Sequence, residues 1–288
     1  MTVTKKRELT AAVQRYAENT ACPDGSTIRT IGLAIERETA RRYDVSRRNV
    51  QIVALQEGIV PTRYLRNIGT LGVDGQTRLV ASKVAVVGIG GLGGTVAKNL
   101  ARVGVGALVL IDGDVFSEDN LNRQEFSSEG VIGRSKAAVA AGEIGKINGA
   151  VEVTAIEKIV NTDDLMEILP GCGVAVDALD TISSRFSLSD AATAAGVPLV
   201  HGAVAGFSGQ VATMMPAAGG FTVIFGDREN LPERGVEVSL GNLPGVVGTV
   251  ANLQTVEVIK ILTNRGQPMS GRFLFMDMET SVFDLFDI

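Results

Sequence analysis

The sequence predicts an α/β fold: a doubly wound, Rossmann-like nucleotide-binding domain with a mixed extension of its sheet and a helical arm at the N-terminus. Residues 83–112 read as strand, tight turn, helix and strand, the opening unit of such a sheet. Apolar runs and helical patterns then alternate as far as residue 201. Two runs near the C-terminus, residues 272–276 and 281–286, alternate as closing strands.

Length and composition fit one large domain with an appendage. The chain has 288 residues, 45% of them hydrophobic, and a mean hydropathy of +0.23, which is ample for a core. We divide it into an arm over residues 1–60 and a nucleotide-binding domain over residues 61–288. No apolar run reaches the length that spans a bilayer, and the N-terminus lacks the apolar core of a signal peptide, so we expect a cytoplasmic protein with no membrane contact.

Charge is unevenly placed along the chain. The net charge is −5, but residues 1–50 hold ten Lys/Arg and six Asp/Glu, which gives +4 there and −9 in the remainder. An acidic body repels nucleic acid, so a nucleic-acid partner is not expected. Cys22 and Cys172 lie far apart without C-x-x-C spacing, which gives no basis for a disulfide framework or a cysteine zinc site.

Three helices are predicted in the arm. The first covers residues 5–19 and is followed by a turn at residues 22–25, the second begins at Ser26, and the third covers residues 47–57. The second would carry Ile28, Ile31, Ile35 and Thr39 on one face. Although the pattern resembles a helix-turn-helix, we favour an arm that covers a partner or a dimer face.

A glycine-rich turn follows the first predicted strand of the domain. Gly88, Gly90 and Gly93 satisfy G-x-G-x-x-G, and a helical stretch at residues 95–103 follows. The pattern lets the chain turn sharply, brings backbone N–H groups against a phosphate and aims a helix N-terminus at the anion. The next apolar run ends in Asp112, where a carboxylate can hold ribose hydroxyls.

Residues beyond this unit argue against a redox dinucleotide, which needs only one pyrophosphate seat. A second carboxylate, Asp114, is followed by two cations, Arg123 and Lys136, and by the polar donors Asn120 and Gln124. Lys136 stands near the start of a helix that is predicted to run to about residue 147. Added cations suit a triphosphate, whose leaving pyrophosphate gathers negative charge.

Ordered motifs along the chain point to one family. They are GIGGLGG, LIDGDV, NLNRQ, GRSKA, DALD and GVVGTVANLQTVEVIKIL. Spread over roughly residues 63–287, they resemble those of the MoeB/ThiF/HesA family of ubiquitin-activating-like adenylyltransferases. The resemblance implies a homodimer that uses ATP and Mg²⁺ to activate the C-terminal glycine carboxylate of a small ubiquitin-like sulfur-carrier protein ending in Gly-Gly, with release of pyrophosphate.

The resemblance also implies roles for individual residues. The expected catalytic residues are Asp180, which would hold Mg²⁺, and the cations Arg123, Lys136 and Arg66, which would neutralise the phosphates. Asp112 would fix the ribose. The residues expected to contact the nucleotide are Gly88, Gly90, Gly91, Gly93, Asp112, Asp114, Asn120, Arg123, Gln124, Lys136, Asp180 and Thr181.

Asp180 is also favoured by its position after a strand. The apolar residues 173–176 lead into Asp177 and Asp180. A carboxylate at this end of a parallel strand faces the crevice where doubly wound sheets bind ligands, and Mg²⁺ prefers oxygen ligands. Asp177 is either a cap of the strand end or part of the site. Thr181 stands where the family commonly has asparagine, so one expected hydrogen bond is left open.

Arg66 belongs to a segment before the first strand of the domain. Residues 63–66 match the family's R-Y-x-R, and residues 74–76 match its D-G-Q turn. By resemblance, Arg66 reaches the phosphates of the opposite subunit. On spacing alone, a surface arginine that caps a helix is the alternative.

The region around residue 221 departs from the family, which usually carries a C-x-x-C zinc half-site there. This chain has Phe-Thr-Val-Ile-Phe at residues 221–225 and no cysteine after Cys172, which we expect to be a small buried residue. With His201 as the only histidine, four soft zinc ligands cannot be assembled. We therefore expect no structural zinc, apolar packing in its place, and a structural role for His201.

Two segments after residue 225 also have predicted roles. Residues 227–241 align with the family's crossover loop, where Glu237 and Ser239 replace a cysteine, so a thioester or persulfide there is excluded. Residues 245–263 repeat apolar side chains at helical spacing and read as a core helix. The apolar and acidic tail at residues 283–287 is either a partner surface or a sheet edge.

Two other functions stay open at this point. One is an ATP-dependent enzyme of the same superfamily with a non-protein acceptor, such as the tRNA-modifying dehydratases, which the acidic body disfavours. The other is a non-catalytic, ATP-binding scaffold, which the presence of Arg123, Lys136 and Asp180 disfavours.

Overall fold

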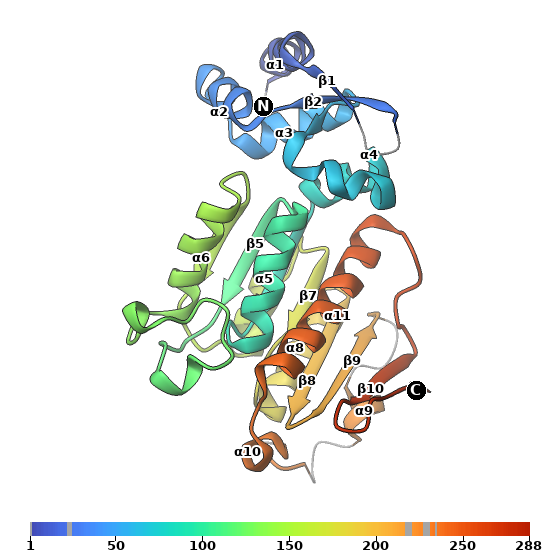
Figure 1. Cartoon of the computed structure of the whole chain (residues 1–288). Helices are drawn as coiled ribbons and strands as arrows, with labels where there is room; N and C mark the ends of the chain where they lie inside the picture. The colour runs from blue at the N-terminus through green and yellow to red at the C-terminus, as the bar shows by residue number, and fades with distance from the viewer. Residues whose placement is uncertain (1, 22–24, 217–220, 227–230, 234) are drawn as a thin grey trace.

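A mixed sheet of eight strands forms the centre of the molecule (Figure 1). The computed structural model describes residues 2–21, 25–216, 221–226, 231–233 and 235–288, with the backbone alone at residues 223 and 237. The strands are β4 (Lys83–Val87), β5 (Ala107–Ile111), β6 (Glu152–Ile156), β7 (Val174–Asp177), β8 (Leu199–Ala205), β9 (Ser208–Met214), β10 (Arg272–Asp277) and β11 (Val282–Asp287).

The order of these strands is β11-β10-β9-β8-β7-β4-β5-β6. Neighbours from β6 to β8 are parallel, and those from β8 to β11 are antiparallel. The predicted doubly wound fold with a mixed extension is therefore confirmed, including both closing strands.

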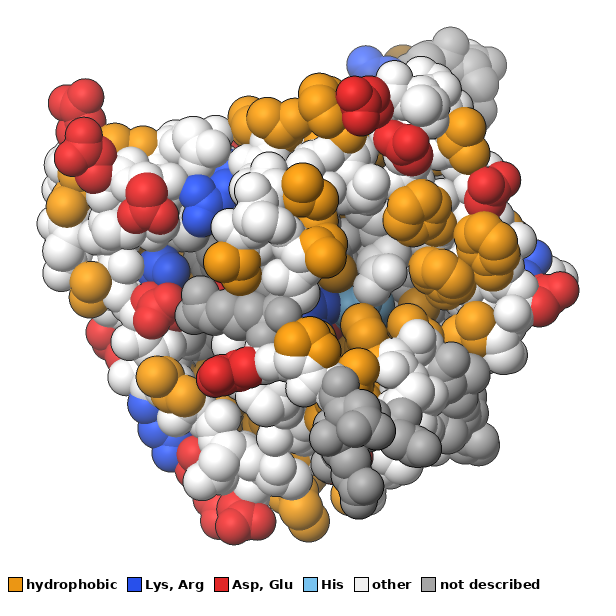
Figure 2. Space-filling view, turned by 90° about the horizontal axis from the view of Figure 1, so that it is seen from below, with side chains coloured by type: hydrophobic (Ala, Val, Ile, Leu, Met, Phe, Trp, Pro, Cys, Tyr) orange, Lys and Arg blue, Asp and Glu red, His pale blue; other side chains and the backbone are white. Residues whose placement is uncertain are grey.

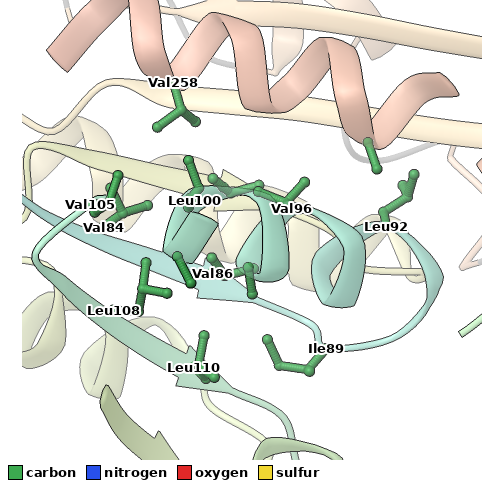
Figure 3. Close-up of a cluster of buried hydrophobic side chains, with 14 of the residues drawn as sticks. Val84, Val86, Ile89, Leu92, Val96, Leu100, Val105, Leu108, Leu110 and Val258 are labelled. Atoms are coloured by element: carbon green, nitrogen blue, oxygen red, sulfur yellow. The ribbon is translucent and has the colours of Figure 1, made fainter. Parts of the chain in front are cut away.

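Helices cover both faces of the sheet. They are α5 (Gly91–Val103), α6 (Lys136–Ile147) and α11 (Pro244–Thr263) on one face, and α7 (Thr162–Ile168), α8 (Ile182–Ala194) and the short α9 (Thr222–Phe225) on the other. The alternation of side chains along β4 feeds both layers, because Val84 and Val86 pack under α5 whereas Ala85 and Val87 pack towards α8. Figure 3 shows Val84 and Val86 in this first layer, which Val258 of α11 closes from above.

The elements of the predicted arm lie above the sheet in Figure 1. It contains α1 (Val3–Tyr16), β1 (Glu18–Ala21), β2 (Thr27–Ile31), α2 (Leu33–Arg42), α3 (Arg47–Gln56) and β3 (Val60–Pro61). Its own apolar core includes Leu9, Val13 and Val50. Arg48 joins it to the body, donating from Nε to the Val80 carbonyl (2.9 Å) and pairing with Glu152 (2.8 Å).

Two predictions for the N-terminal region are wrong. The first helix, predicted to run to residue 19, ends at Tyr16, and strand β1 follows at residues 18–21. The predicted second helix begins instead as strand β2, which pairs antiparallel with β1. Four of its five side chains, at residues 27, 28, 30 and 31, are β-branched, which favours a strand. Gly25 takes the positive φ (84°) that lets the chain turn between the two strands. Residues 22–24 of the predicted turn, with Cys22, lie outside the described residues.

The predicted turn at residues 74–76 is also wrong, because these residues lie inside the helix α4 (Leu65–Ala81). The break in that helix falls at Gly72, with φ 65°. Gln76 is buried and donates to the Val103 carbonyl (2.9 Å), so this segment anchors α4 to the body.

The helix α11 packs in the core, as predicted. Its length contradicts the expectation that no apolar segment is long enough to span a bilayer, since by length and composition it could cross a membrane. Its buried side chains, among them Val247, Val250 and Val258, pack into the core of the sheet, as in the core helix of a globular fold.

Candidate nucleotide-binding site

A cleft of about 600 Å³ opens at the carboxyl ends of β4, β5 and β7. This is the edge of a doubly wound sheet where ligands bind. Of the residues predicted for the site, those that line the cleft are Gly88, Gly90, Gly91, Asp112, Asp114, Arg123, Gln124, Lys136, Asp180 and Thr181. Gly93, Asn120 and Arg66 do not line it.

The glycine turn needs its glycines for close packing. Gly88 has φ 88°, and a Cβ there would meet the Ala178 carbonyl oxygen at 2.5 Å. A Cβ on Gly93 would meet the Gly88 carbonyl oxygen at 1.8 Å, so the third glycine allows the helix to pack on the turn without itself facing the cleft. A Cβ on Gly91 would meet Val247 at 2.8 Å, which ties the turn to α11.

Asp112 lies at the end of β5 and is tied to the glycine turn. Its Oδ2 accepts the Ile89 backbone N–H (2.6 Å), and its Oδ1 accepts that of Asp114 (2.8 Å). Burial raises the pKa of Asp112 above its ordinary value, although these two hydrogen bonds and the nearby Lys136 charge each lower it. The carboxyl thus holds the turn and still borders the cleft.

Lys136 brings a cation to the same wall. Ser135 caps α6 through its side chain, which accepts the Ala138 N–H, and Lys136 is the first residue of the helix. The lysine stem is buried, and its Nζ lies 3.0 Å from Asp114 Oδ2. The ammonium is therefore fixed at the cleft by a partner that is itself exposed.

The loop between β5 and α6 supplies Arg123 and Gln124. Arg123 Nη1 donates to the Asp119 carbonyl (2.7 Å) and to Asn122 Oδ1 (2.8 Å). Gln124 is buried, and its Oε1 has no hydrogen-bond partner among the described residues. Asn120 shapes the loop from behind, because its Oδ1 accepts the Ser117 N–H (3.2 Å).

The turn after β7 places Asp180 in the cleft. Asp180 is exposed, whereas Asp177 is fully buried and accepts the Leu179 N–H on Oδ1 (3.0 Å). Arg185 of α8 donates to the Leu179 carbonyl and lies 3.4 Å from Asp177 Oδ2. Burial alone would raise the pKa of Asp177, but the Arg185 charge and the His201 hydrogen bond hold it below the ordinary value.

One wall of the cleft was not predicted. It consists of Lys158, Ile159, Val160 and Leu165, which follow β6 and begin α7. Ile159 is 83% exposed although it lines the cleft, and Lys158 pairs with Asp164 at 2.7 Å. These residues form no motif. The one feature of the sequence that could have indicated them is their position directly after β6, the parallel neighbour of β5.

Aromatic packing occupies the region where the family usually has its first zinc half-site. Phe221 is buried, and its ring centroid lies 5.9 Å from that of Phe186 and 5.4 Å from that of Phe225. The apolar packing predicted for this region is confirmed, and the absence of zinc stays a prediction. Cys172 is buried as expected, and burial raises the pKa of its thiol.

The described part of the predicted crossover segment approaches the cleft. The Glu233 carbonyl accepts the Ile182 N–H at the start of α8 (2.9 Å). The short helix α10 (Glu237–Leu240) brings Val238 to the cleft wall, and Ser239 Oγ donates to the Val236 carbonyl (2.9 Å).

The chain is similar to known proteins over most of its length. Residues 64–288 match the ThiF family. Identity to the SAMP-activating enzyme E1 of Haloferax volcanii is 37% over 227 residues, which covers 77% of this chain and 83% of the relative. Identity to the molybdopterin-synthase adenylyltransferase of Salmonella typhimurium is 33% over 234 residues, covering 77% and 90%. The adenylyltransferase and sulfurtransferase MOCS3 of Mus musculus is 37% identical over 75% of this chain, which spans 47% of that relative.

Solved structures share the fold. The crystal structure of E. coli MccB with ATP superimposes with a TM-score of 0.70 at 20% identity, covering 88% of this chain and 82% of that one. The structure of PaaA gives a TM-score of 0.65 at 22% identity, covering 78% and 82%. At these identities the likeness concerns the fold.

Proposed function

The chain belongs to the ThiF family, and on that premise we propose that it is an ATP-dependent adenylyltransferase. Its acceptor is the C-terminal glycine carboxylate of a small ubiquitin-like sulfur-carrier protein. The two relatives that the alignment covers over most of their length are an activating enzyme and an adenylyltransferase, which supports the reaction class. The proposal places the activity in the cytoplasm, where ATP is available.

The observation that carries the proposal is the composition of the cleft. It combines a glycine turn, the cations Arg123 and Lys136, and the exposed carboxylate of Asp180 around one cavity. Gln124 Oε1 is a buried acceptor without a partner among the described residues, so a ligand with a hydrogen-bond donor fits beside it. A nucleotide triphosphate meets all of these groups.

In the reaction, a carboxylate oxygen of the carrier attacks the α-phosphorus of ATP. The bond from that phosphorus to the bridging oxygen breaks, pyrophosphate leaves with the electron pair, and an acyl-adenylate remains on the carrier. Arg123 and Lys136 stabilise the charge that gathers on the leaving group, and Asp112 holds the ribose. Catalysis follows from positioning and charge, without a protein nucleophile.

Asp180 fits the role of a magnesium ligand. Its carboxylate is exposed to the cleft and forms no ion pair with any described residue. Mg²⁺ is commonly held by one or two carboxylates together with the phosphates of the substrate. When bound, the ion supplies charge neutralisation to the phosphates.

An exposed apolar surface next to the cleft supports a protein as the acceptor. Figure 2 shows hydrophobic side chains gathered on this face. Exposed apolar side chains include Val238, which lines the cleft, with Leu240 and Leu243 close after it in the chain, and Val282, Phe283, Leu285 and Phe286 on the edge strand β11, each at least 41% exposed. Exposed apolar side chains beside a cleft are a feature of surfaces that contact another protein.

A pyrophosphate exchange assay tests the proposal. Labelled pyrophosphate should enter ATP only when a carrier with a free Gly-Gly terminus is added. The matched control is the same carrier extended by one alanine, which should give no exchange. Exchange without any carrier would instead favour a small-molecule acceptor, and no exchange with any carrier of the class would oppose the proposal.

We further propose that the working unit is a homodimer in which Arg66 acts on the partner's site. Arg66 is exposed at the start of α4 and does not line the cleft of its own chain, which is compatible with action across an interface. Mixed dimers of Arg66→Ala and Asp180→Ala chains contain one intact site. Such mixtures should regain activity that neither variant has alone, and no recovery despite demonstrated subunit exchange would oppose the assignment.

A further inference from the structure

His201 is buried in the middle of β8 and contacts polar groups at both ring nitrogens. Its Nδ1 lies 2.6 Å from Asp177 Oδ2, and its Nε2 lies 3.0 Å from Gln210 Nε2. The rings of Phe221 and Phe225 meet it edge to face at centroid distances of 5.0 and 5.6 Å. Its exposed fraction is 0%.

These contacts define the protonation state of the ring. A carboxylate oxygen and an imidazole nitrogen 2.6 Å apart need a proton between them. Arg185 Nη1 also lies 3.1 Å from Nδ1, but its two hydrogens are directed to Asp177 Oδ2 (3.4 Å) and to the Gly202 carbonyl (3.2 Å). We therefore assign the hydrogen of the ring to Nδ1, which donates it to Asp177. Nε2 then accepts from the Gln210 amide. Burial lowers the pKa of His201, which agrees with a neutral ring, and Arg185 supplies the positive charge that faces Asp177.

The same network holds the turn that carries Asp180. Asp177 Oδ1 accepts the Leu179 N–H (3.0 Å), and Arg185 donates to the Leu179 carbonyl, so both ends of this residue are bound. Arg185 also donates to the Gly202 carbonyl (3.2 Å), next to His201 on β8. The network thus extends from the aromatic cluster to the floor of the cleft.

We propose that His201 is a positioning residue for the adenylation site: its Nδ1–H fixes the Asp177 carboxylate, which with Arg185 holds the 178–180 turn so that Asp180 meets the metal–nucleotide complex. The role of Asp180 rests on the proposed function, whereas the contacts of His201 are properties of the fold. A histidine that only filled space against Phe221 and Phe225 would leave nucleotide binding unchanged by the loss of Nδ1–H.

Two substitutions separate these roles. In His201→Asn the amide nitrogen stands near the position of Nδ1 and can still donate to Asp177, whereas in His201→Gln it stands near the position of Nε2 and cannot. Glutamine fills more of the ring's volume, so packing alone favours it. If packing alone matters, His201→Gln should bind nucleotide better than His201→Asn. If His201 positions Asp177, His201→Asn should bind nucleotide better than His201→Gln.

Calorimetric titration with MgATP, without any carrier, measures the effect. His201→Asn should bind within about 3-fold of the wild type, and His201→Gln should bind about 10-fold or more weakly, the usual cost of a lost hydrogen bond to a charged group. The thermal midpoints of both variants are measured alongside. Equal affinities, or affinities that follow the thermal midpoints, would overturn the proposal.

A second readout does not depend on nucleotide. Because His201 is the only histidine of the chain, ring nitrogen signals of protein labelled at histidine and purified without a histidine tag report on it alone. The Nδ1–H tautomer at pH 7 is expected, and the Nε2–H tautomer or a charged ring would overturn the proposal. If the wild type does not bind MgATP, both the proposed function and the role of Asp180 are wrong. If the wild type binds MgATP and the two variants bind it equally well, only the inference about His201 is wrong.

Discussion

Asp112 follows β5 and Asp177 ends β7, the two strands that flank β4, and each is followed by a second acidic residue, Asp114 or Asp180. The same turn is built at both places. Asp112 Oδ1 accepts the N–H of residue 114 (2.8 Å), and Asp177 Oδ1 accepts that of residue 179 (3.0 Å). Yet Asp112 borders the cleft with a raised pKa, whereas Asp177 is fully buried with a lowered one.

The difference comes from what lies over each carboxylate. Arg185 of α8 folds back over Asp177, and His201 of β8 donates to it. On the other side the Lys136 ammonium pairs with Asp114, so Asp112 receives backbone N–H groups but no ion pair among the described residues. A position at a strand end brings a carboxylate to the edge of the sheet where ligands bind. Whether that carboxylate is then buried or exposed to the cleft depends on the side chains that later elements pack against it.

The largest expected effect concerns the two acidic residues that follow these carboxylates. Asp180→Ala should lower pyrophosphate exchange by about 100-fold or more, because a metal ligand contributes several kcal/mol to charge stabilisation. Asp114→Ala should cost only about 10-fold, because Lys136 keeps its charge and loses an exposed partner. Asp163→Ala, which removes an exposed carboxylate outside the cleft, is the control. Equal losses in the first two variants would show that the two turns are functionally alike.

The next effect is on stability. Asp177→Asn leaves Arg185 buried without its charged partner and should lower the free energy of unfolding by about 3 kcal/mol. Asp112→Asn should change it by no more than about 1 kcal/mol, because the amide oxygen can keep one backbone hydrogen bond and the burial cost of a charge disappears.

Urea unfolding and nucleotide titration of both variants check this prediction. Asp112→Asn should weaken ATP binding while it keeps stability, and Asp177→Asn should show the larger loss of stability. The reverse order would mean that the buried network is less important to the fold than the distances suggest.

Long elements with a sustained apolar repeat could be predicted from the sequence, whereas short elements in the arm could not. The helix at residues 136–147 and the core helix at 245–263 were found within one or a few residues of their ends, because each repeats apolar side chains over several turns. In the arm, Ile28, Ile31 and Ile35 fit helical spacing by chance, and the five residues of β2 do not alternate between buried and exposed side chains, so no strand signal opposed the helix.

The candidate site shows the same division. Glycines and charged residues in motifs could be predicted, whereas Ile159 and Lys158 could not, because ordinary side chains become a cleft wall only through the place of their strand in the sheet. Asp177 and Asp180 could not be told apart in sequence as buried or exposed. Their difference depends on Arg185 and His201, which lie 8 and 24 residues after Asp177.

A smaller effect follows from pH. The pKa of His201 is lowered in the folded state from an ordinary value of 6.5, so below about pH 6.5 the unfolded chain binds a proton that the folded chain refuses. The free energy of unfolding should therefore fall on acidification, by up to about 1.4 kcal/mol per pH unit from this group. Asp177 adds its own loss only below its ordinary pKa of 3.8.

Chemical unfolding between pH 8 and pH 5 measures this slope. Other groups, including Asp112, contribute equally to the wild type and to His201→Asn, so the difference between the two isolates the histidine. The variant should show a flatter profile over this range. Parallel profiles would mean that His201 binds its proton equally in the folded and unfolded states, which would contradict the lowered pKa.

The smallest effect concerns the other end of β7, where Cys172 precedes the strand that Asp177 ends. Cys172 is 7% exposed with a raised pKa, and His201 has both ring nitrogens engaged by Asp177 and Gln210, so neither is available as a zinc ligand. Replacing both Cys22 and Cys172 by alanine should therefore lower the free energy of unfolding by only about 1 kcal/mol, the scale of one small buried group, and should leave adenylation intact. A chelator should not change the thermal midpoint of the wild type. Stoichiometric zinc by elemental analysis would show that a metal stabilises this region in place of the aromatic cluster, and loss of adenylation without cysteine would show that a cysteine is required.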